Sequence, residues 1–219
     1  MSTISIDQVE KTIDITCDTV IRNEKYFSDL DGLAGDGDFG TSLATGFKVI
    51  KKELPEIDKS AIGAMLLKIS MICSKHVGGS SGPIWGTGFM RAGMVAKGLE
   101  ELTYQNLVDM LGSAIEGIVA RGGAKRGDKT LLDALWPIHD KMQEMDGSDL
   151  GAVLAAITAE ADKAIDETRT LIAHGRASQV GQRSADTPDP GIVGIATILY
   201  DWCKAYGVDY SPNAKELNR

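Results

Sequence analysis

The sequence has only three cysteines, few aromatic residues and no excess of positive charge. Cys17, Cys73 and Cys203 lie in apolar segments of helical period and form no CxxC pair, which favours buried, reduced thiols over a metal or redox site. Basic residues number 23 against 31 acidic ones and are dispersed, which disfavours nucleic acid as a partner. An anionic ligand would therefore need a metal, a helix N-terminus or a placed arginine.

No apolar run approaches the roughly 20 residues of a membrane span. Residues 1–7 show no basic stretch followed by an apolar one. We therefore expect a cytoplasmic protein with no signal peptide and no membrane contact. The composition is ordinary for a globular protein and no shift in composition marks a linker, so residues 1–219 are expected to form a single domain.

Apolar residues recur with helical period along nearly the whole chain, and no segment is a convincing strand. Short connections between amphipathic helices make neighbouring helices antiparallel, so the sequence predicts an all-α helical bundle or barrel. Eight helices are expected, with apolar stripes at residues 6–21, 43–54, 62–73, 85–99, 107–118, 132–142, 150–172 and 195–206.

Local signals predict where these helices begin and end. Ser5 and Gln8 form a capping-box pattern at the first helix, and Asp58 or Ser60 is expected to cap the third. Proline and glycine are expected to end three of the helices, because one cannot continue a helix and the other adopts positive φ. These stop signals are Pro55, Gly122–Gly123 and Gly207.

The stretch Leu30–Thr41 carries three carboxylates, Asp31, Asp36 and Asp38, among four glycines. Such a loop can direct several oxygens at one point, as Mg²⁺ requires, commonly with substrate phosphates as further ligands. An Asp/Gly run is also typical of an ordinary turn. The GxGxxG match within it follows no strand, and the calcium loop counted from Asp36 lacks its glutamate at position 12, so Rossmann and EF-hand sites are excluded.

Further segments open helices and suit phosphate binding, because a helix N-terminus presents free N–H groups and a positive dipole end. The first is the Gly/Ser-rich turn Gly78–Pro83, and the second is Asp189–Gly191 before the last helix. Lys129 lies at another helix start, where it either contributes to such a site or is a solvated surface charge. A plain helix-entry turn remains the alternative for the first segment, and simple N-capping for the second.

The connection from His174 to Asp189 is long, and loops of this length without structure of their own are usually functional or disordered. It carries Arg176 and Arg183. An acidic, metal-ready loop, several phosphate-binding helix starts and a long loop with arginines together suit Mg²⁺-nucleotide binding and phosphoryl transfer.

Taken together, the motifs resemble the nucleotide-binding L subunit of dihydroxyacetone kinase. Each motif is weak alone, but their order and spacing are specific. The resemblance implies an antiparallel eight-helix barrel that holds ADP or ATP and two Mg²⁺ ions at one end. The motifs are Asp31-x4-Asp36-x-Asp38, Gly78-Gly79-Ser80-Ser81-Gly82-Pro83, Gly127-Asp128-Lys129-Thr130, and Gly175-Arg176-Ala177-Ser178 followed by Asp189-Pro190-Gly191.

The resemblance also implies roles for individual residues. Asp31, Asp36 and Asp38 would be the metal ligands, and Ser80 and Ser81 would reach the phosphates. No catalytic residue is assigned, because the family's triose is bound covalently to a histidine of a separate K subunit. The other nucleotide-site residues that the resemblance implies are Phe39, Gly40, Thr41, Ser42, Gly122, Leu131, Arg176, Asp189, Pro190 and Gly191.

Two positions depart from the family pattern, in which His-Gly follows the third aspartate and Asn commonly follows two positions further on. This chain has Phe39 and Ser42 in those places. Phe39 cannot hydrogen-bond a phosphate, and Ser42 reaches less far than Asn. The substitutions therefore affect phosphate geometry and partner class more than metal binding, and they fit a divergent branch that acts on another short keto sugar, such as a tetrose.

The leading hypothesis is a kinase subunit that passes a phosphoryl group to dihydroxyacetone or a related ketose held on a K-type partner. The alternative is a non-catalytic nucleotide-state sensor that docks a regulator or a sugar-binding protein. In the family, a phosphotransferase-system phosphocarrier recharges bound ADP in some systems, and others use ATP directly. The sequence leaves the sugar, the mode of recharging and the oligomeric state, a homodimer included, open.

Overall fold

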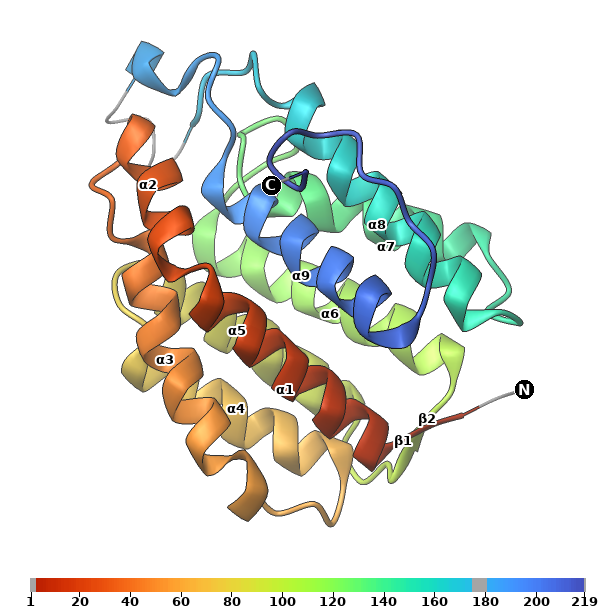
Figure 1. The fold of residues 1–219 in the computed structure, drawn as a ribbon. Coiled ribbons are helices and arrows are strands. Elements are labelled where there is room, and N and C mark those ends of the chain that lie inside the picture. Colours follow the sequence, from red (N-terminus) through yellow and green to blue (C-terminus); the bar gives the residue numbers. More distant parts are fainter. Residues whose placement is uncertain (1–2, 175–180, 219) are drawn as a thin grey trace.

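Helices dominate the computed structural model, which describes residues 3–174 and 181–218 (Figure 1). The prediction of an all-α bundle is confirmed. The short 3-10 helix η1 (Leu54–Glu56) follows α3, as Pro55 predicts. The α-helices of this described part are α1 (Ile6–Arg22), α2 (Glu24–Ala34), α3 (Phe39–Glu53), α4 (Ile62–His76), α5 (Ser81–Val95), α6 (Tyr104–Gly122), α7 (Leu132–Glu144), α8 (Leu150–Glu167) and α9 (Pro190–Tyr206).

Four elements differ from the periodicity. The sequence pattern misses α2, because this 11-residue helix buries only Phe27 and Leu30 and its other residues are half-buried or exposed. The strands β1 (Ile4–Ser5) and β2 (Glu101–Leu102) form a two-residue antiparallel pair, too short to give an alternating pattern. Helix α8 ends before the predicted stripe does, and Ile172 is exposed beyond it.

The predicted cap of α1 is confirmed, and that of α4 is wrong. Ser5 Oγ accepts the Gln8 N–H at 3.3 Å while Gln8 Oε1 accepts the Ser5 N–H at 2.8 Å. Asp58 instead accepts hydrogen bonds from Ser60, which closes a local turn, and α4 begins after Ala61 without a side-chain cap. The left-handed glycines that end α6 and α9 confirm the predicted stops at Gly123 and Gly207.

The buried apolar residues form two main clusters. One lies among α1, α3, α4 and α5, and includes Phe47 and Met65. The other joins α2 to α7, α8 and α9, and includes Phe27 and Ile165. Phe39, at the start of α3, packs against both clusters and therefore sits where the two halves of the bundle meet. Cys17, Cys73 and Cys203 are buried and unpaired, as expected.

No helix within the described residues is long and apolar enough to cross a membrane.

Helices α2 and α3 cross in close contact at Gly40, which is buried. A Cβ atom added at Gly40 would lie 1.9 Å from the Glu24 carbonyl oxygen and 2.7 Å from the Ser28 nitrogen. Backbone atoms cannot move aside as a side chain can, so only glycine permits this crossing. The crossing fixes the direction in which the α2–α3 connection leaves the bundle, at the same end as the start of α9 (Figure 1).

We predict that Gly40→Ala lowers the free energy of unfolding by at least about 2 kcal/mol, because the added methyl group forces α2 and α3 apart. Gly32→Ala is the matched control on α2. A Cβ there meets nothing closer than 4.0 Å, so helix propensity alone should raise stability by up to about 1 kcal/mol. Urea denaturation followed by circular dichroism measures both, and equal effects of the two substitutions would contradict the crossing constraint.

Candidate functional site

Asp31, Asp36 and Asp38 come together at the connection between α2 and α3. One carboxylate oxygen from each residue lies within 4.8 Å of those of the other two. The carboxylate of Asp31 accepts the Phe39 N–H at 3.3 Å, which joins the end of α2 to the start of α3. Within the described ranges this is the one group of His, Cys, Asp or Glu side chains close enough to hold an ion. Three oxygen donors with this charge suit a hard cation such as Mg²⁺.

Two glycines let the chain turn sharply enough to bring these carboxylates together. Gly37 has φ of 77°, a left-handed conformation that a side chain disfavours. At Gly35 a Cβ atom would lie 2.3 Å from Asp31 Oδ1, so a larger residue there would displace the Asp31 carboxylate. The glycines of the motif therefore serve the convergence of the aspartates.

The cluster carries uncompensated negative charge. Desolvation raises the pKa of Asp31, and the nearby charge of Asp36 acts in the same direction, against hydrogen bonds from the Phe39, Gly37 and Asp38 N–H groups. Desolvation and Asp36 also raise the pKa of Asp38. A divalent cation between the carboxylates would relieve this repulsion, which is the electrostatic condition for a metal site.

The turn between α4 and α5 lies against the acidic loop. A Cβ atom at Gly79, whose φ is 58°, would lie 4.0 Å from Asp38 Oδ2. One at Gly78 would lie 2.6 Å from Ser42 Oγ. Ser80 and Ser81 follow at the start of α5, and the Ser80 side chain makes no capping hydrogen bond. The predicted phosphate-binding turn and the predicted metal ligands are therefore neighbours.

The start of α9 lies against two other predicted residues. A Cβ atom at Gly191 would lie 3.1 Å from the Leu131 Cβ, and the Phe39 ring lies 3.8 Å from such an atom at Gly194. Asp189 caps α9, with its carboxylate accepting the Ile192 N–H at 2.9 Å, as expected for that helix start.

The end of α6 completes this end of the bundle. A Cβ atom at Gly122 would lie 3.4 Å from Ile84 of α5, and a small apolar cluster joins Ile84 to Leu131 and Leu132. The structure thus links the acidic loop, the α5 start, the α6 end, the α7 start and the α9 start by direct contacts. Arg176 lies outside the described residues.

Two predicted residues also make contacts within the protein itself. The Thr41 N–H donates to Ser28 Oγ at 3.2 Å, which ties the first turn of α3 to α2. The Phe39 ring lies 6.1 Å from that of Phe27, centroid to centroid, and packs between the two apolar clusters. At position 39 the side chain therefore contributes to packing.

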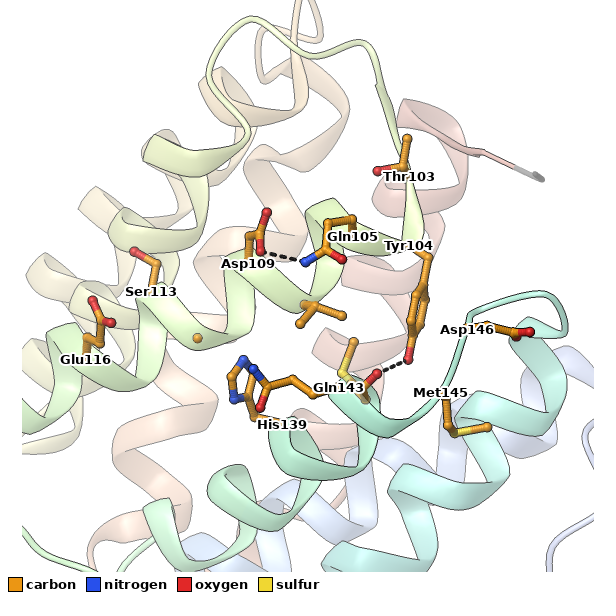
Figure 2. A pocket seen from close by; sticks show the side chains of 13 residues that line it. Thr103, Tyr104, Gln105, Asp109, Ser113, Glu116, His139, Gln143, Met145 and Asp146 are labelled. Atoms are coloured by element: carbon orange, nitrogen blue, oxygen red, sulfur yellow. Dashed lines mark hydrogen bonds between the residues drawn. The ribbon is translucent and has the colours of Figure 1, made fainter.

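A cavity of about 780 Å³ lies elsewhere, between α6 and α7, toward the start of α6 and the end of α7 (Figure 2). None of the predicted site residues that the structure describes lines it. Asp109 in its wall accepts a hydrogen bond from Gln105 at 2.9 Å, and Glu116 pairs with Arg91 at 3.4 Å. Because these polar groups already bond within the protein, the acidic end of the bundle is the better candidate for chemistry.

Lys129 is not a solvated charge, contrary to one of the two sequence interpretations. Its side chain is 2% exposed, and its Nζ donates to the carbonyl oxygens of Arg169 and Leu171 at 2.9 Å each and of Ser184 at 2.6 Å. Desolvation lowers the Lys129 pKa, against the opposing charge of Asp189. The motif around Lys129 is thus an internal anchor beside the site.

Sequence reasoning also missed Asp133. Its carboxylate accepts the Gly127 N–H at 2.6 Å and the Thr130 N–H at 2.9 Å, which closes the turn that carries Lys129. The spacing of Thr130 and Asp133 matches the capping-box pattern, so the signal was present in the sequence.

Asp189 is the most strongly perturbed carboxyl of the site. Desolvation raises its pKa to about 7, and the nearby Asp133 acts in the same direction. The N–H groups of Ile192 and Gly191 and the charge of Lys129 oppose this shift.

The profile of the DAK2 domain matches residues 33–204. The chain belongs to the DAK2-domain family. It is 33% identical over 187 residues to the ADP-binding subunit DhaL of the PEP-dependent dihydroxyacetone kinase of Escherichia coli, covering 84% of this chain and 89% of that subunit. It is 32% identical to the L-erythrulose 1-kinase of Mycolicibacterium smegmatis over 81% of this chain and 32% of that enzyme.

A solved structure with the same fold is the dihydroxyacetone kinase of C. freundii in complex with AMP-PNP and Mg²⁺. It matches with a TM-score of 0.72 and 22% identity over 90% of this chain and about a third (33%) of that one. The resemblance to the L subunit of dihydroxyacetone kinase, predicted from the order of four motifs, is confirmed, and the relatives' names agree with the prediction of a kinase subunit.

We predict that Asp189→Asn removes a pH dependence of stability. In the wild type the folded chain keeps the Asp189 proton between about pH 4 and 7 while the unfolded chain loses it, so the free energy of unfolding falls as pH rises through this window. Asparagine keeps the cap but cannot ionise. The stability of the variant relative to the wild type should therefore rise by about 2 kcal/mol from pH 4 to pH 7.

Denaturation series at each pH, without nucleotide or divalent ions, measure this difference. Asp149→Asn, at the N-cap of α8, makes the same exchange at an exposed position and serves as the reference for the cap itself. If the difference in the free energy of unfolding between Asp189→Asn and wild type stays constant over pH 4–7, the raised pKa of Asp189 is refuted.

Proposed function

We propose that this chain binds ADP or ATP with two Mg²⁺ ions at the acidic end of its bundle. It passes the phosphoryl group to dihydroxyacetone or a related short-chain ketose held on a separate K-type subunit. The observation that carries the proposal is the convergence of Asp31, Asp36 and Asp38 beside the glycine-serine turn at the start of α5, in a chain of the DAK2-domain family.

The donor set fits Mg²⁺, because the three carboxylates offer only hard oxygen ligands. Asp31, Asp36 and Asp38 would hold the ions, which supply positive charge against the phosphates when bound. The phosphates would lie between this cluster and the N–H groups and hydroxyls of Ser80 and Ser81. The nucleoside would then extend toward Gly122, Leu131 and the Asp189–Gly191 helix start.

Phe39 holds the α3 start in place and contributes no phosphate contact in this proposal. Its ring packs against Gly194 and Phe27, and its N–H orients the Asp31 carboxylate. Thr41 and Ser42 complete the edge of the site nearest the phosphates, and Arg176 adds positive charge from the long connection. No side chain of this chain is assigned to bind the ketose.

The remaining parts of the proposal concern partners. The PEP-dependent relative supports a phosphocarrier that recharges bound ADP, and exchange of ATP is the other route. A cytoplasmic location agrees with three buried, unpaired cysteines. Residues 1–219 as a single domain and a homodimer as the oligomeric state stay predictions.

A second candidate is a kinase subunit for a tetrose. The relative named L-erythrulose 1-kinase and the Phe39 departure favour it. A non-catalytic nucleotide sensor is the third, since loss of a phosphate contact at position 39 is compatible with binding without turnover.

We predict that Asp36→Asn lowers the Mg²⁺-dependent affinity for ADP at least tenfold, because the remaining carboxylates would then face the phosphates with less metal between them. Asp29→Asn is the matched control, since Asp29 lies on α2, pairs with Lys25 at the surface and is outside the cluster. It should change the affinity less than twofold. Isothermal titration of ADP with and without Mg²⁺ measures these affinities. An Asp36→Asn variant with the same Mg²⁺-dependent affinity for ADP as the wild type would refute the metal site.

We predict that the chain, mixed with a K-type subunit, ATP, Mg²⁺ and a ketose, yields a phosphorylated sugar, and that either protein alone yields none. Mass spectrometry of parallel reactions with dihydroxyacetone and L-erythrulose identifies the preferred substrate. Nucleotide binding without any phosphorylated product from either sugar would instead favour the sensor.

A further inference from the structure

We propose that Lys129 is a positioning residue of the nucleotide site. Its buried ammonium fixes the α7 start relative to the segments before and after residues 175–180, and so sets the spacing between Leu131 and Gly191. This inference rests on the proposed function.

The Lys129 ammonium is fully engaged inside the protein. An ammonium group has three protons, and three carbonyl oxygens accept from Nζ at 2.6–2.9 Å. With 2% of the residue exposed, no proton remains for a bound phosphate. Lys129 can therefore affect the nucleotide only through the backbone that it holds.

The three acceptors come from two different segments. Arg169 and Leu171 follow α8, whereas Ser184 belongs to the stretch that leads into α9. Lys129 itself lies on the turn before α7. One ammonium thus joins its own turn to two pieces of backbone that lie 40 to 55 residues further along the sequence.

Neutral hydrogen bonds connect the same three pieces. Ser184 Oγ accepts the Ala173 N–H at 2.9 Å, which joins the two segments to each other. The His174 N–H donates to the Asp128 carbonyl oxygen at 3.0 Å, which joins the first segment to the turn. The ammonium is the charged centre of this arrangement, and charge-assisted bonds are about twice as strong as neutral ones.

The joined segments lead directly into the site. The turn continues from Lys129 through Thr130 to Leu131, and the stretch from Ser184 continues to Gly191. Leu131 and Gly191 are close neighbours, since a Cβ atom at position 191 would lie 3.1 Å from the Leu131 Cβ, tighter than usual packing. A change in the relative position of the turn and the Ser184 segment would therefore open or close the site at this contact.

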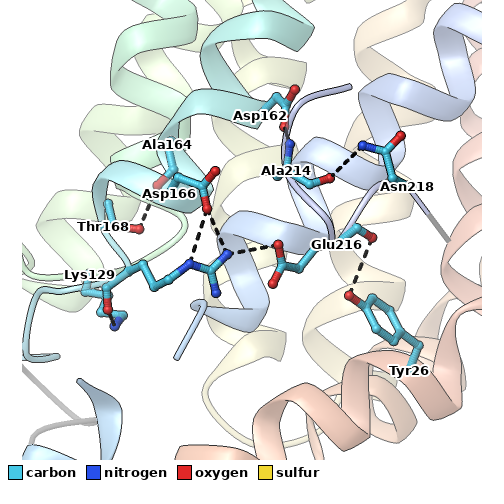
Figure 3. A network of polar contacts seen from close by, with 10 residues as sticks. Tyr26, Lys129, Asp162, Ala164, Asp166, Thr168, Ala214, Glu216 and Asn218 are labelled. Atoms are coloured by element: carbon cyan, nitrogen blue, oxygen red, sulfur yellow. Dashed lines mark hydrogen bonds and ion pairs between the residues drawn. The ribbon is translucent and has the colours of Figure 1, made fainter. Parts of the chain in front are cut away.

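The far side of the arrangement is fixed to the body of the protein. The Arg169 guanidinium pairs with Asp166 at 2.8 Å and with the buried Glu216 at 3.0 Å (Figure 3). The Asp162 carboxylate of α8 holds the same C-terminal stretch, accepting the Tyr210 hydroxyl and the Ala214 N–H. Because these bonds do not involve Lys129, they remain when its charge is removed.

The acidic loop stands apart from this arrangement. Hydrogen bonds between α2 and the start of α3 hold it, it lies against the α4–α5 turn, and the Phe39 ring meets α9 at Gly194. The three hydrogen bonds of the Lys129 ammonium all go to other segments. Loss of the ammonium should therefore disturb the nucleoside side of the site and leave the metal ligands in place. A role limited to overall stability would not separate these two effects.

The test compares Lys129→Met, which keeps the chain length of the side chain and removes the charge, with Lys125→Met, the same exchange at an exposed position of the same loop. Each is used below its melting temperature, checked by circular dichroism. Isothermal titration gives the Kd of Mg²⁺-ADP, and electron paramagnetic resonance gives the Kd of Mn²⁺ alone. For Lys129→Met we expect ADP to bind at least tenfold more weakly and Mn²⁺ to change less than twofold, with both within twofold for Lys125→Met.

An unchanged ADP affinity in folded Lys129→Met, or equal losses for ADP and Mn²⁺, would overturn the inference. If this variant does not fold, Ser184→Ala takes its place, since it removes the bond to the Ala173 N–H and keeps the ammonium. It should weaken ADP at least threefold at constant Mn²⁺ affinity, and no effect on ADP would overturn the inference. A wild-type chain that fails to bind Mg²⁺-ADP would instead refute the proposed function.

Discussion

Three carboxylates within 4.8 Å of one another repel, so the surrounding helices must hold them together. The Asp31 carboxylate is held by the Phe39 N–H, and this bond depends on where α3 begins. That start is fixed by the backbone contact of α2 and α3 at Gly40 and by the packing of the Phe39 ring against both apolar clusters. The metal-ready cluster is thus a product of the junction between the two halves of the bundle.

On the other side of the site, the support comes from the buried positive charge of Lys129. Lys129 joins the α7 start to the segments that follow α8 and precede α9, and Asp189, the cap of α9, feels its charge. The carboxylates and the α5 start make up the phosphate side, and the segments around Lys129 make up the nucleoside side. Different hydrogen bonds support the two sides, and the Phe39 ring beside Gly194 is a packing contact between them.

Phe39 departs from the family pattern, and its role in the fold differs from the one that the sequence indicates. By sequence, an aromatic residue in the place of histidine means a lost phosphate contact. In the fold the centroid of its ring lies 6.1 Å from that of Phe27, and the ring lies against Gly194 in the first turns of α9. The side chain therefore packs between the two halves of the bundle, next to the site. The backbone N–H at this position, which any residue supplies, is what orients Asp31.

The sequence by itself determined the helices with strong apolar stripes, the caps at Ser5, Gly123 and Gly207, and the family, because period, capping and motif order depend on residues a few positions apart. It did not reveal α2, whose 11 residues bury only two side chains. Nor did it place Lys129, because the carbonyl groups that accept its protons belong to residues 40 to 55 positions away. Which helix ends meet, and which charge is buried between them, is decided only when distant segments pack, since burial and hydrogen bonding depend on neighbours that no local pattern records.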